Sequence, residues 1–188
     1  MPRDLPNQAQ TRLGAHPALS ANLVSLTPAE THRMTPKAPS PPAQPTLGIK
    51  ANERAELGTS LSWTQVRAGL KLNPDGLIPA IAQQHDSGEV LMLAWMNLQS
   101  LDETLATGRV CYWSRSRGKL WRKGESSGQV QQLKELRLDC DGDTLLLLVD
   151  QTGPACHTGR ANCFYNAVRG DRVEVIAEPL IDPDQLYK

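Results

Sequence analysis

Three aspartates stand at alternate positions in LDCDGDTLLLL, residues 138–148. Their types and spacing suggest chemistry. Asp139, Asp141 and Asp143 surround one cysteine, Cys140, and an apolar run follows them. In an extended strand the three carboxylates would share one face and Cys140 would point to the other. Clustered carboxylates repel one another unless a cation neutralises them. The pattern therefore indicates either a magnesium site or a solvated acidic turn.

Backbone geometry sets a condition on the magnesium site. Residues two apart in a straight strand are separated by roughly 6.6 Å, whereas Mg²⁺ takes ligand oxygens at about 2.0–2.1 Å. One straight strand cannot bring all three carboxylates to one ion, but Gly142 permits a bend that folds Asp143 back toward its neighbours. A calcium loop is disfavoured, because the D-x-[DN]-x-[DN]-G frame with its distal glutamate is missing.

Thiols form the second candidate group. Cys156 and Cys163 are separated by six residues in ACHTGRANCF, which is not the two-residue spacing of a zinc knuckle. Together with Cys140 they make three soft ligands, and His157 follows one of them directly. Three ligands and an open fourth position suit a catalytic zinc that binds water. The alternative is that these are small buried cysteines, as we expect for Cys111.

A basic segment, residues 112–129 (YWSRSRGKLWRKGESSGQ), forms the third candidate group. Five cations lie within nine residues, interleaved with two tryptophans and followed by a loop of glutamate, serines and glycine. Guanidinium groups, hydroxyls and backbone N–H groups hold phosphates, and tryptophan can stack on a base. A solvated hairpin or a site for single-stranded nucleic acid would use the same residue types. The expected substrate contacts are Arg115, Arg117, Lys123, Glu125, Ser126 and Ser127.

The elements that must position these groups are mostly strands. Ser62 and Gln65 predict a capping box for a short helix that ends near Gly69. Asn97 predicts the N-cap of a helix over 98–107, and Gly108 its end. Strands are expected at 77–82 and 90–95, joined as a hairpin, and at 109–115, 130–139, 144–150, 163–168 and 172–177. We therefore expect an α+β domain with a mostly antiparallel sheet and a few short helices.

Composition divides the chain and limits its class. Nine of the 14 prolines and no aromatic residue fall within residues 1–58, which predicts a disordered Pro-rich tail before a folded domain at 59–188. The net charge is zero, so no global footprint for nucleic acid is visible. Neither a membrane-spanning run nor a secretory signal is apparent. We expect a cytoplasmic protein whose cysteines are reduced and free to bind metal.

Five segments together resemble the phosphoribosyl-AMP cyclohydrolases. They are DGLIPAIAQ, GEVLMLAWMN, YWSRSRGKLWRKGESSG, LDCDGDTLLLLV, and ACHTG followed by CF. The resemblance runs from about Trp63 to Phe164 and does not include the tail. It implies an enzyme of histidine biosynthesis that hydrolyses the N1–C6 bond of the adenine ring in 1-(5-phosphoribosyl)-AMP. No phosphoribosyl-ATP pyrophosphohydrolase domain follows, as one does in fused members of the family.

The resemblance also implies two metals and a second copy of the chain. Its magnesium ligands would be Asp139, Asp141 and Asp143. Its zinc ligands, shared between the subunits of an intertwined homodimer, would be Cys140 of one chain and Cys156 and Cys163 of the other. His157 is the best-placed general base for the attacking water. The implied partners are the small-molecule substrate and the second copy, without nucleic acid or membrane.

Two other classes would use some of the same residues. A structural-zinc module that binds single-stranded nucleic acid could employ the cysteines and the basic segment, but it calls for a fourth ligand and a basic domain. A zinc-dependent base deaminase would show H-x-E with P-C-x-x-C, and both are missing from the sequence. The sequence therefore favours the cyclohydrolase interpretation.

Overall fold

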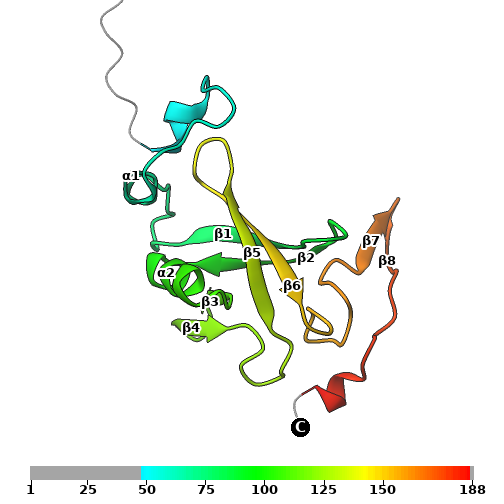
Figure 1. The fold of residues 1–188 in the computed structure, drawn as a ribbon. Helices are drawn as coiled ribbons and strands as arrows, with labels where there is room; N and C mark the ends of the chain where they lie inside the picture. Colours follow the sequence, from blue (N-terminus) through cyan, green and yellow to red (C-terminus); the bar gives the residue numbers. More distant parts are fainter. Residues whose placement is uncertain (1–47, 187–188) are drawn as a thin grey trace, which may run out of the picture. The chain divides into compact units, whose positions relative to one another are not determined.

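The computed structural model describes residues 48–186 (Figure 1). Most of the predicted tail lies outside this range, so the domain boundary near residue 58 stays a prediction. The first described element is a 3₁₀ helix, Ile49–Asn52. Gly48 lies against Gly69, and the side chain of Ile49 lies against Gly142. This short segment therefore contacts the turn that carries the aspartates.

A mixed six-stranded sheet forms the centre of the described region, with strand order β4-β3-β2-β1-β6-β5. Its strands are β1 (Ile78–Gln84), β2 (Val90–Met96), β3 (Cys111–Ser114), β4 (Lys119–Arg122), β5 (Gln131–Leu138) and β6 (Leu145–Gln151). Four of the neighbouring pairs are antiparallel, and β1 with β6 is parallel. The α+β class is confirmed. Two features were not expected from the sequence: strand β4 and the parallel pairing of β1 with β6.

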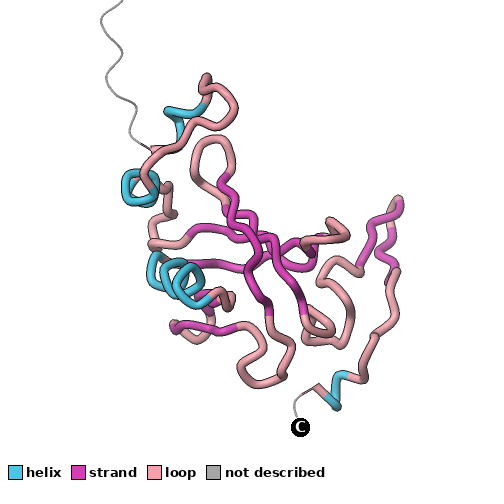
Figure 2. The backbone as a smooth tube through the Cα atoms, viewed as in Figure 1, coloured by secondary structure: helices cyan, strands magenta, loops and turns pink. Residues whose placement is uncertain are grey.

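Alternating side chains of the two central strands build the core. Ile78, Ala80 and Ala82 of β1 are fully buried, and so are Leu145, Leu147 and Val149 of β6. Successive strand residues point to opposite faces, so each strand gives every second residue to the same face. The central strands cross the molecule as one twisted layer (Figure 2). The sheet is thus a rigid support for the loops at its two ends.

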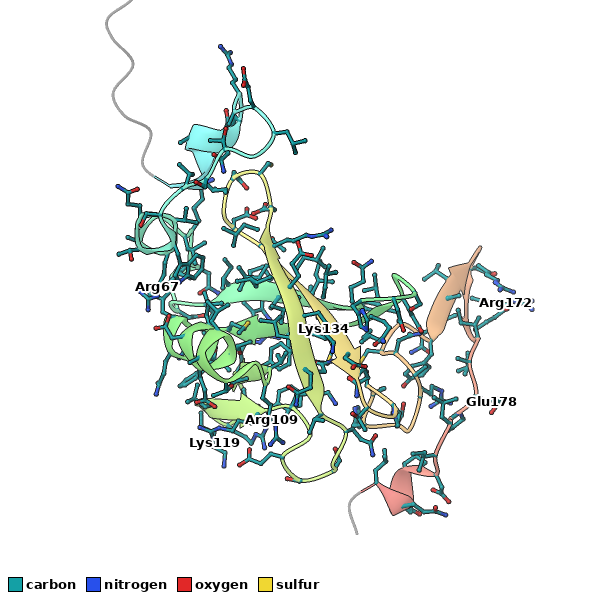
Figure 3. All side chains as sticks on the ribbon, in the orientation of Figure 1. Arg67, Arg109, Lys119, Lys134, Arg172 and Glu178 are labelled. Carbon is teal, nitrogen blue, oxygen red and sulfur yellow. The ribbon has the colours of Figure 1, made fainter. Side chains whose placement is uncertain are left out.

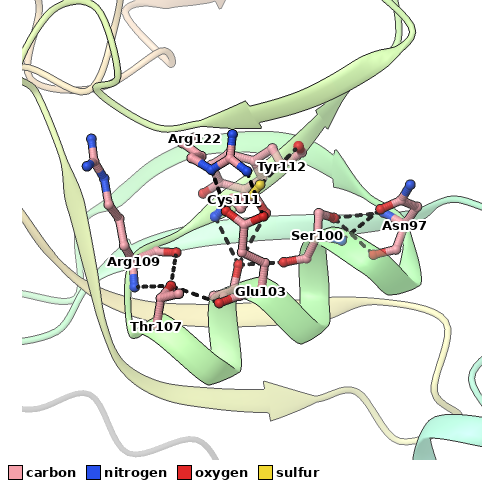
Figure 4. A network of polar contacts seen from close by, with 9 residues as sticks. Asn97, Ser100, Glu103, Thr107, Arg109, Cys111, Tyr112 and Arg122 are labelled. Atoms are coloured by element: carbon pink, nitrogen blue, oxygen red, sulfur yellow. Dashed lines mark hydrogen bonds and ion pairs between the residues drawn. The ribbon is translucent and has the colours of Figure 1, made fainter.

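Helix α2 (Leu98–Thr107) follows β2 and lies against β2 and β3. The Asn97 side chain accepts a hydrogen bond from the Ser100 N–H at 2.8 Å, and the Ser100 hydroxyl accepts one from the Asn97 N–H at 3.0 Å (Figure 4). Gly108 ends the helix in the left-handed conformation, with φ of 71°. Both predicted ends of this helix are confirmed.

Helix α1 (Trp63–Ala68) has the predicted bounds but not the predicted cap. The Ser62 side chain makes no capping hydrogen bond, so the capping box expected from Ser62 and Gln65 is wrong. Arg67 instead joins α1 to α2 through a paired contact with Asp102, at 2.7 and 2.6 Å. A tertiary ion pair therefore helps to hold a helix that is too short to be stable alone.

An ion pair joins helix α2 to the basic segment. The Arg122 guanidinium on β4 donates two hydrogen bonds to the Glu103 carboxylate on α2, at 2.5 and 2.9 Å (Figure 4). The Thr104 hydroxyl, which is buried, accepts a hydrogen bond from the Cys111 N–H at 2.9 Å. These contacts fix β3 and β4, and with them the loop that follows β4.

The last elements form a separate two-stranded sheet, β7 (Asn166–Arg169) with β8 (Arg172–Val175), and a 3₁₀ helix, Pro183–Gln185. Val168, Val173 and Val175 of this hairpin are exposed. Arg172 on β8 and Lys134 on β5 mark charged side chains on the outside of the two sheets (Figure 3). Among residues 48–186, no helix is long and apolar enough to cross a membrane.

Candidate active site

The basic segment and residues 155–163 after β6, here called the cysteine loop, line one cavity of about 240 Å³. The loop after β4 supplies one wall, and the chain after β6 supplies the other. The lining residues are Met92, Arg117, Trp121, Lys123, Gly124, Glu125, Ser126, Ser127, Ala155, His157 and Cys163. The structure thus brings together five of the six expected substrate contacts, the expected base and one expected zinc ligand. The base and the zinc ligand follow the substrate contacts by 30 or more positions in the sequence.

A second, more open cavity of about 710 Å³ adjoins the first. Arg117, Trp121 and His157 line both cavities, so His157 lies where they meet. Arg115, the sixth expected substrate contact, lines only the second cavity and stacks over Trp95 at 5.0 Å. Arg117 stacks over Trp121 at 5.9 Å. The two cavities together could hold an extended ligand with an anionic group at each end.

Glycine geometry holds the loop after β4 in place. Gly124 has φ of 78°, and a Cβ there would come within 2.5 Å of the Gln129 carbonyl carbon and the Val130 nitrogen. No other residue type fits this position, because the loop passes directly over the start of β5. Glu125, Ser126 and Ser127 are therefore presented at the cavity by a loop of fixed shape.

Cys156, which is buried, lies near enough to the exposed Cys163 to affect its pKa. Desolvation of the Cys163 thiol, and then the neighbouring Cys156, raise the pKa of Cys163 to about 12. The Cys156 sulfur also lies 3.1 Å from the Thr158 hydroxyl. Two adjacent thiols are suitable soft ligands, yet they are one fewer than the zinc site implied by the resemblance requires.

The aspartate segment is a turn between β5 and β6, not a strand. Gly142 has φ of 76°, which confirms the expected bend. The Asp139 carboxylate accepts hydrogen bonds from the backbone N–H groups of Gly142, Asp143 and Thr144 at 3.0, 2.9 and 3.1 Å. Asp139 therefore organises the turn, a role that the sequence analysis did not foresee.

The expected separation of Cys140 from its neighbouring carboxylates is wrong. Ligand atoms of Asp139, Cys140 and Asp141 lie within 4.8 Å of one another, because the turn removes the alternation of a strand. Asp143 is not in this group, and its carboxylate accepts a hydrogen bond from the Thr144 hydroxyl at 3.0 Å. The group has the geometry of a possible metal site.

Lys71 forms an ion pair with one of these carboxylates, that of Asp141. Its ammonium lies 2.5 Å from an Asp141 oxygen, and this hydrogen bond is the largest cause of the raised pKa of Lys71. Both side chains are partly exposed, so the pair contributes little to stability. A cation bound at Asp141 would share this carboxylate with Lys71 or displace it. The two partly buried carboxylates of the group fit a hard ion such as Mg²⁺, whereas its third member, Cys140, is a soft ligand.

The two cysteine groups lie at opposite ends of β6. Cys140 precedes this strand in the sequence and Cys156 follows it. The strand has seven residues, and at about 3.3 Å per residue it spans roughly 20 Å. Zinc–sulfur bonds are about 2.3 Å long. Among the described residues Cys140 accordingly groups with Asp139 and Asp141 as potential metal ligands, and not with Cys156 or Cys163.

The sequence did not predict the structural role of some residues that line the cavity. Met92 and Ala155 carry no sequence signal, because apolar residues are common in any core. Lys123 was expected to contact substrate, but its burial was not expected: it is only 5% exposed.

Comparison with known proteins agrees with this geometry. The family model described as phosphoribosyl-AMP cyclohydrolase matches residues 92–165. A protein of Halorhodospira halophila named phosphoribosyl-AMP cyclohydrolase is 70% identical over 139 residues, which are 74% of this chain and 98% of that protein. Its namesake from Alkalilimnicola ehrlichii is 71% identical over 139 residues, with the same coverage. A third namesake, from Hydrogenovibrio crunogenus, is 61% identical over 142 residues, 76% of this chain and 97% of its own length.

Proposed function

Because the chain belongs to the phosphoribosyl-AMP cyclohydrolase family, a family of hydrolases in histidine biosynthesis, we propose that its two adjoining cavities bind 1-(5-phosphoribosyl)-AMP. Water would then open the adenine ring between N1 and C6. The observation that carries this assignment is the cavity wall shared by the basic segment, His157 and Cys163. The basic segment, which would bind the phosphates, thus shares the cavity with His157 and Cys163, which could help to activate water. The nucleic-acid alternative is not favoured.

The proposed zinc site is shared between two subunits. Cys140 of one chain and Cys156 and Cys163 of the other would hold the ion. The adjacency of the last two thiols and the length of β6 both support this arrangement. Bound zinc would lower the pKa of a water ligand and so supply a nucleophile near neutral pH. The proposed homodimer is therefore a condition for catalysis.

His157 is the proposed general base. It lies at the junction of the two cavities, between the cysteine pair and the basic segment. From this position its imidazole can take a proton from the attacking water and return it to the leaving ring nitrogen. The residue is exposed, and we expect bound substrate to cover it and exclude bulk water.

The basic segment is proposed to bind the two phosphate groups. Arg117 and the hydroxyls of Ser126 and Ser127 line the smaller cavity, and Arg115 lines the larger one. Guanidinium and hydroxyl groups both donate hydrogen bonds to phosphate oxygens. Glu125 of the same wall would contact a ribose hydroxyl or a metal-bound water. The substrate would thus be held at both ends while the ring lies between them.

The carboxylates Asp139, Asp141 and Asp143 are proposed to hold Mg²⁺. The first two belong to the group whose ligand atoms lie within 4.8 Å. Across the dimer, the partner's Cys140 brings this turn to the cysteine pair, so the magnesium would lie close to the substrate. We expect the reaction to take place in the cytoplasm.

A direct assay tests the assignment. Purified full-length protein is incubated with phosphoribosyl-AMP, Zn²⁺ and Mg²⁺, and the ring-opened carboxamide is followed by absorbance. Formation of this product supports the proposal, and it should stop when a chelator removes the zinc. Protein that contains zinc, is folded and dimeric, and still leaves the substrate unchanged would contradict it.

A further inference from the structure

Two backbone hydrogen bonds close the turn that carries His157. The Gly159 N–H donates to the Cys156 carbonyl at 3.1 Å across residues 156–159, here called the His157 turn. The Cys156 N–H also donates to the Arg160 carbonyl at 3.1 Å. Cys156 and Gly159 are buried, whereas His157 between them is exposed. The position of His157 therefore depends on what fixes the two buried ends of its turn.

Residues 178–186, here called the C-terminal segment, fix one of these ends. The Gly159 carbonyl accepts two hydrogen bonds from the segment, from the N–H groups of Leu180 at 2.8 Å and Ile181 at 3.3 Å. Leu186, at the other end of the segment, is only 5% exposed, so the segment is anchored beyond these contacts as well. It is the one buried residue of the segment, which therefore adds little apolar burial to the fold.

Gly159 has no room for a side chain at this contact. Its φ is 75°, and a Cβ there would lie 1.8 Å from the Ile181 carbonyl oxygen. Arg160, the next residue, stacks over Tyr165 at 4.2 Å and donates a hydrogen bond to the Ala177 carbonyl at 2.7 Å. Two consecutive residues after His157 and Thr158 thus contact the last part of the described chain.

We propose that the C-terminal segment positions His157 for catalysis by holding the Gly159 end of its turn. This inference rests on the proposed role of His157 as the general base. A general base must lie within hydrogen-bond reach of the proton that it takes, and a misplacement of about 1 Å can lower a rate by roughly 10²-fold. Neither Gly159 nor the segment is among the residues that line the two cavities, so they are positioning residues and not catalytic residues.

Two leucines of the segment provide a matched pair of variants. Leu186→Ala removes the buried anchor and should let the segment detach from Gly159. Leu180→Ala is the control, because the Leu180 side chain is 66% exposed and the variant keeps the N–H that bonds to Gly159. Both are compared with the wild type as full-length protein, at saturating Zn²⁺ and well below the Tm.

The test measures kcat, KM and amide hydrogen exchange across residues 156–160. We expect Leu186→Ala to lose roughly 10–100-fold in kcat, because His157 is no longer held in place. Its KM should stay near the wild-type value, because the proposed phosphate contacts lie on the basic segment. Its hydrogen exchange across these residues should be faster, since the turn loses its support. Leu180→Ala should match the wild type in all three quantities.

Other outcomes separate the inference from the proposed function. A segment that only stabilises the fold would lower the Tm of Leu186→Ala and leave its kcat unchanged. That result, or hydrogen exchange like that of the wild type, would overturn the positioning role and leave the proposed function standing. A wild-type protein without turnover would overturn both.

A second pair of variants serves if Leu186→Ala does not fold. Gly159→Ala takes its place, with Gly170→Ala as the control. Both glycines have positive φ, at 75° and 63°, but only Gly159 would bring a Cβ against another part of the described chain. Gly159→Ala should then show the loss of kcat and the faster exchange, and Gly170→Ala should show neither. Equal kcat in these two variants would overturn the positioning role.

Discussion

At the scale of single residues, His157 gives the clearest separation of catalysis from metal binding. It lies at the junction of the cavities but is not among the proposed zinc ligands. We predict that His157→Gln keeps zinc, dimer and Tm while kcat falls by roughly 10²–10⁴-fold, the usual contribution of a general base. Zinc analysis and steady-state kinetics on one preparation check this. Near-normal kcat would remove His157 from the mechanism.

Asp139 and Asp141 lie in one turn, yet replacing each with alanine should have a different effect on stability and activity. Asp139 accepts three backbone hydrogen bonds, so Asp139→Ala should lower the free energy of unfolding by about 1–3 kcal/mol. Within residues 48–186, Asp141 pairs with the exposed Lys71 alone. Asp141→Ala should therefore keep its stability, lose activity and regain part of it in excess Mg²⁺.

Denaturant unfolding and a magnesium titration of activity distinguish the two variants. Asp150→Ala is the control, because Asp150 is an exposed aspartate that pairs with Lys134 at 3.3 Å. It should leave both quantities unchanged. Full activity of Asp141→Ala at limiting magnesium would argue against Asp141 as a ligand.

For single residues, the sequence predicted which residues matter better than it predicted their surroundings in the fold. The bend at Gly142 was predictable, because glycine alone adopts its backbone angle without cost. The burial of Lys123 was not predictable, because lysine is almost always exposed. Its position depends on how β4 and the cysteine loop meet across the cavity, which is a tertiary feature.

At the scale of elements, the loop after β4 should depend on Gly124. Gly118 and Gly124 both have positive φ, but only Gly124 has backbone atoms in the place of a Cβ. Gly118→Ala should lower stability by about 1–2 kcal/mol, the cost of the left-handed conformation alone. Gly124→Ala should lower it by more and should also raise the KM, since the loop must shift. Equal effects of the two substitutions on Tm and KM would contradict the proposed role of the loop.

The elements that the sequence predicted are those with local signals. Both ends of α2 follow from Asn97 and Gly108, whose effects act within one helical turn. Strand β4 was missed because its four residues, KLWR, have two cations and no strand-like alternation beyond a single pair. The parallel pairing of β1 with β6 was missed because no local pattern encodes which distant strand lies beside another.

At the scale of the whole molecule, the account requires two chains for each active site. The described chain holds Cys163 in its cavity, Cys156 close to Cys163, and Cys140 at the far end of β6. A symmetric dimer would complete two such sites at once. Removing the zinc should therefore weaken the dimer as well as abolish turnover, because the metal joins the subunits. Sedimentation with and without chelator checks this, and a dimer of unchanged stability would contradict a zinc ion that joins the subunits.

Complementation between two inactive variants tests the shared site most directly. Cys140→Ser and Cys156→Ser chains carry different tags, are mixed under conditions that allow subunit exchange, and are purified through both tags. In the heterodimer one site keeps all three cysteines and the other keeps one. The account predicts that each variant alone is inactive, and that the heterodimer binds one zinc and has about half of the wild-type activity. A purified heterodimer that stays inactive and zinc-free would contradict it.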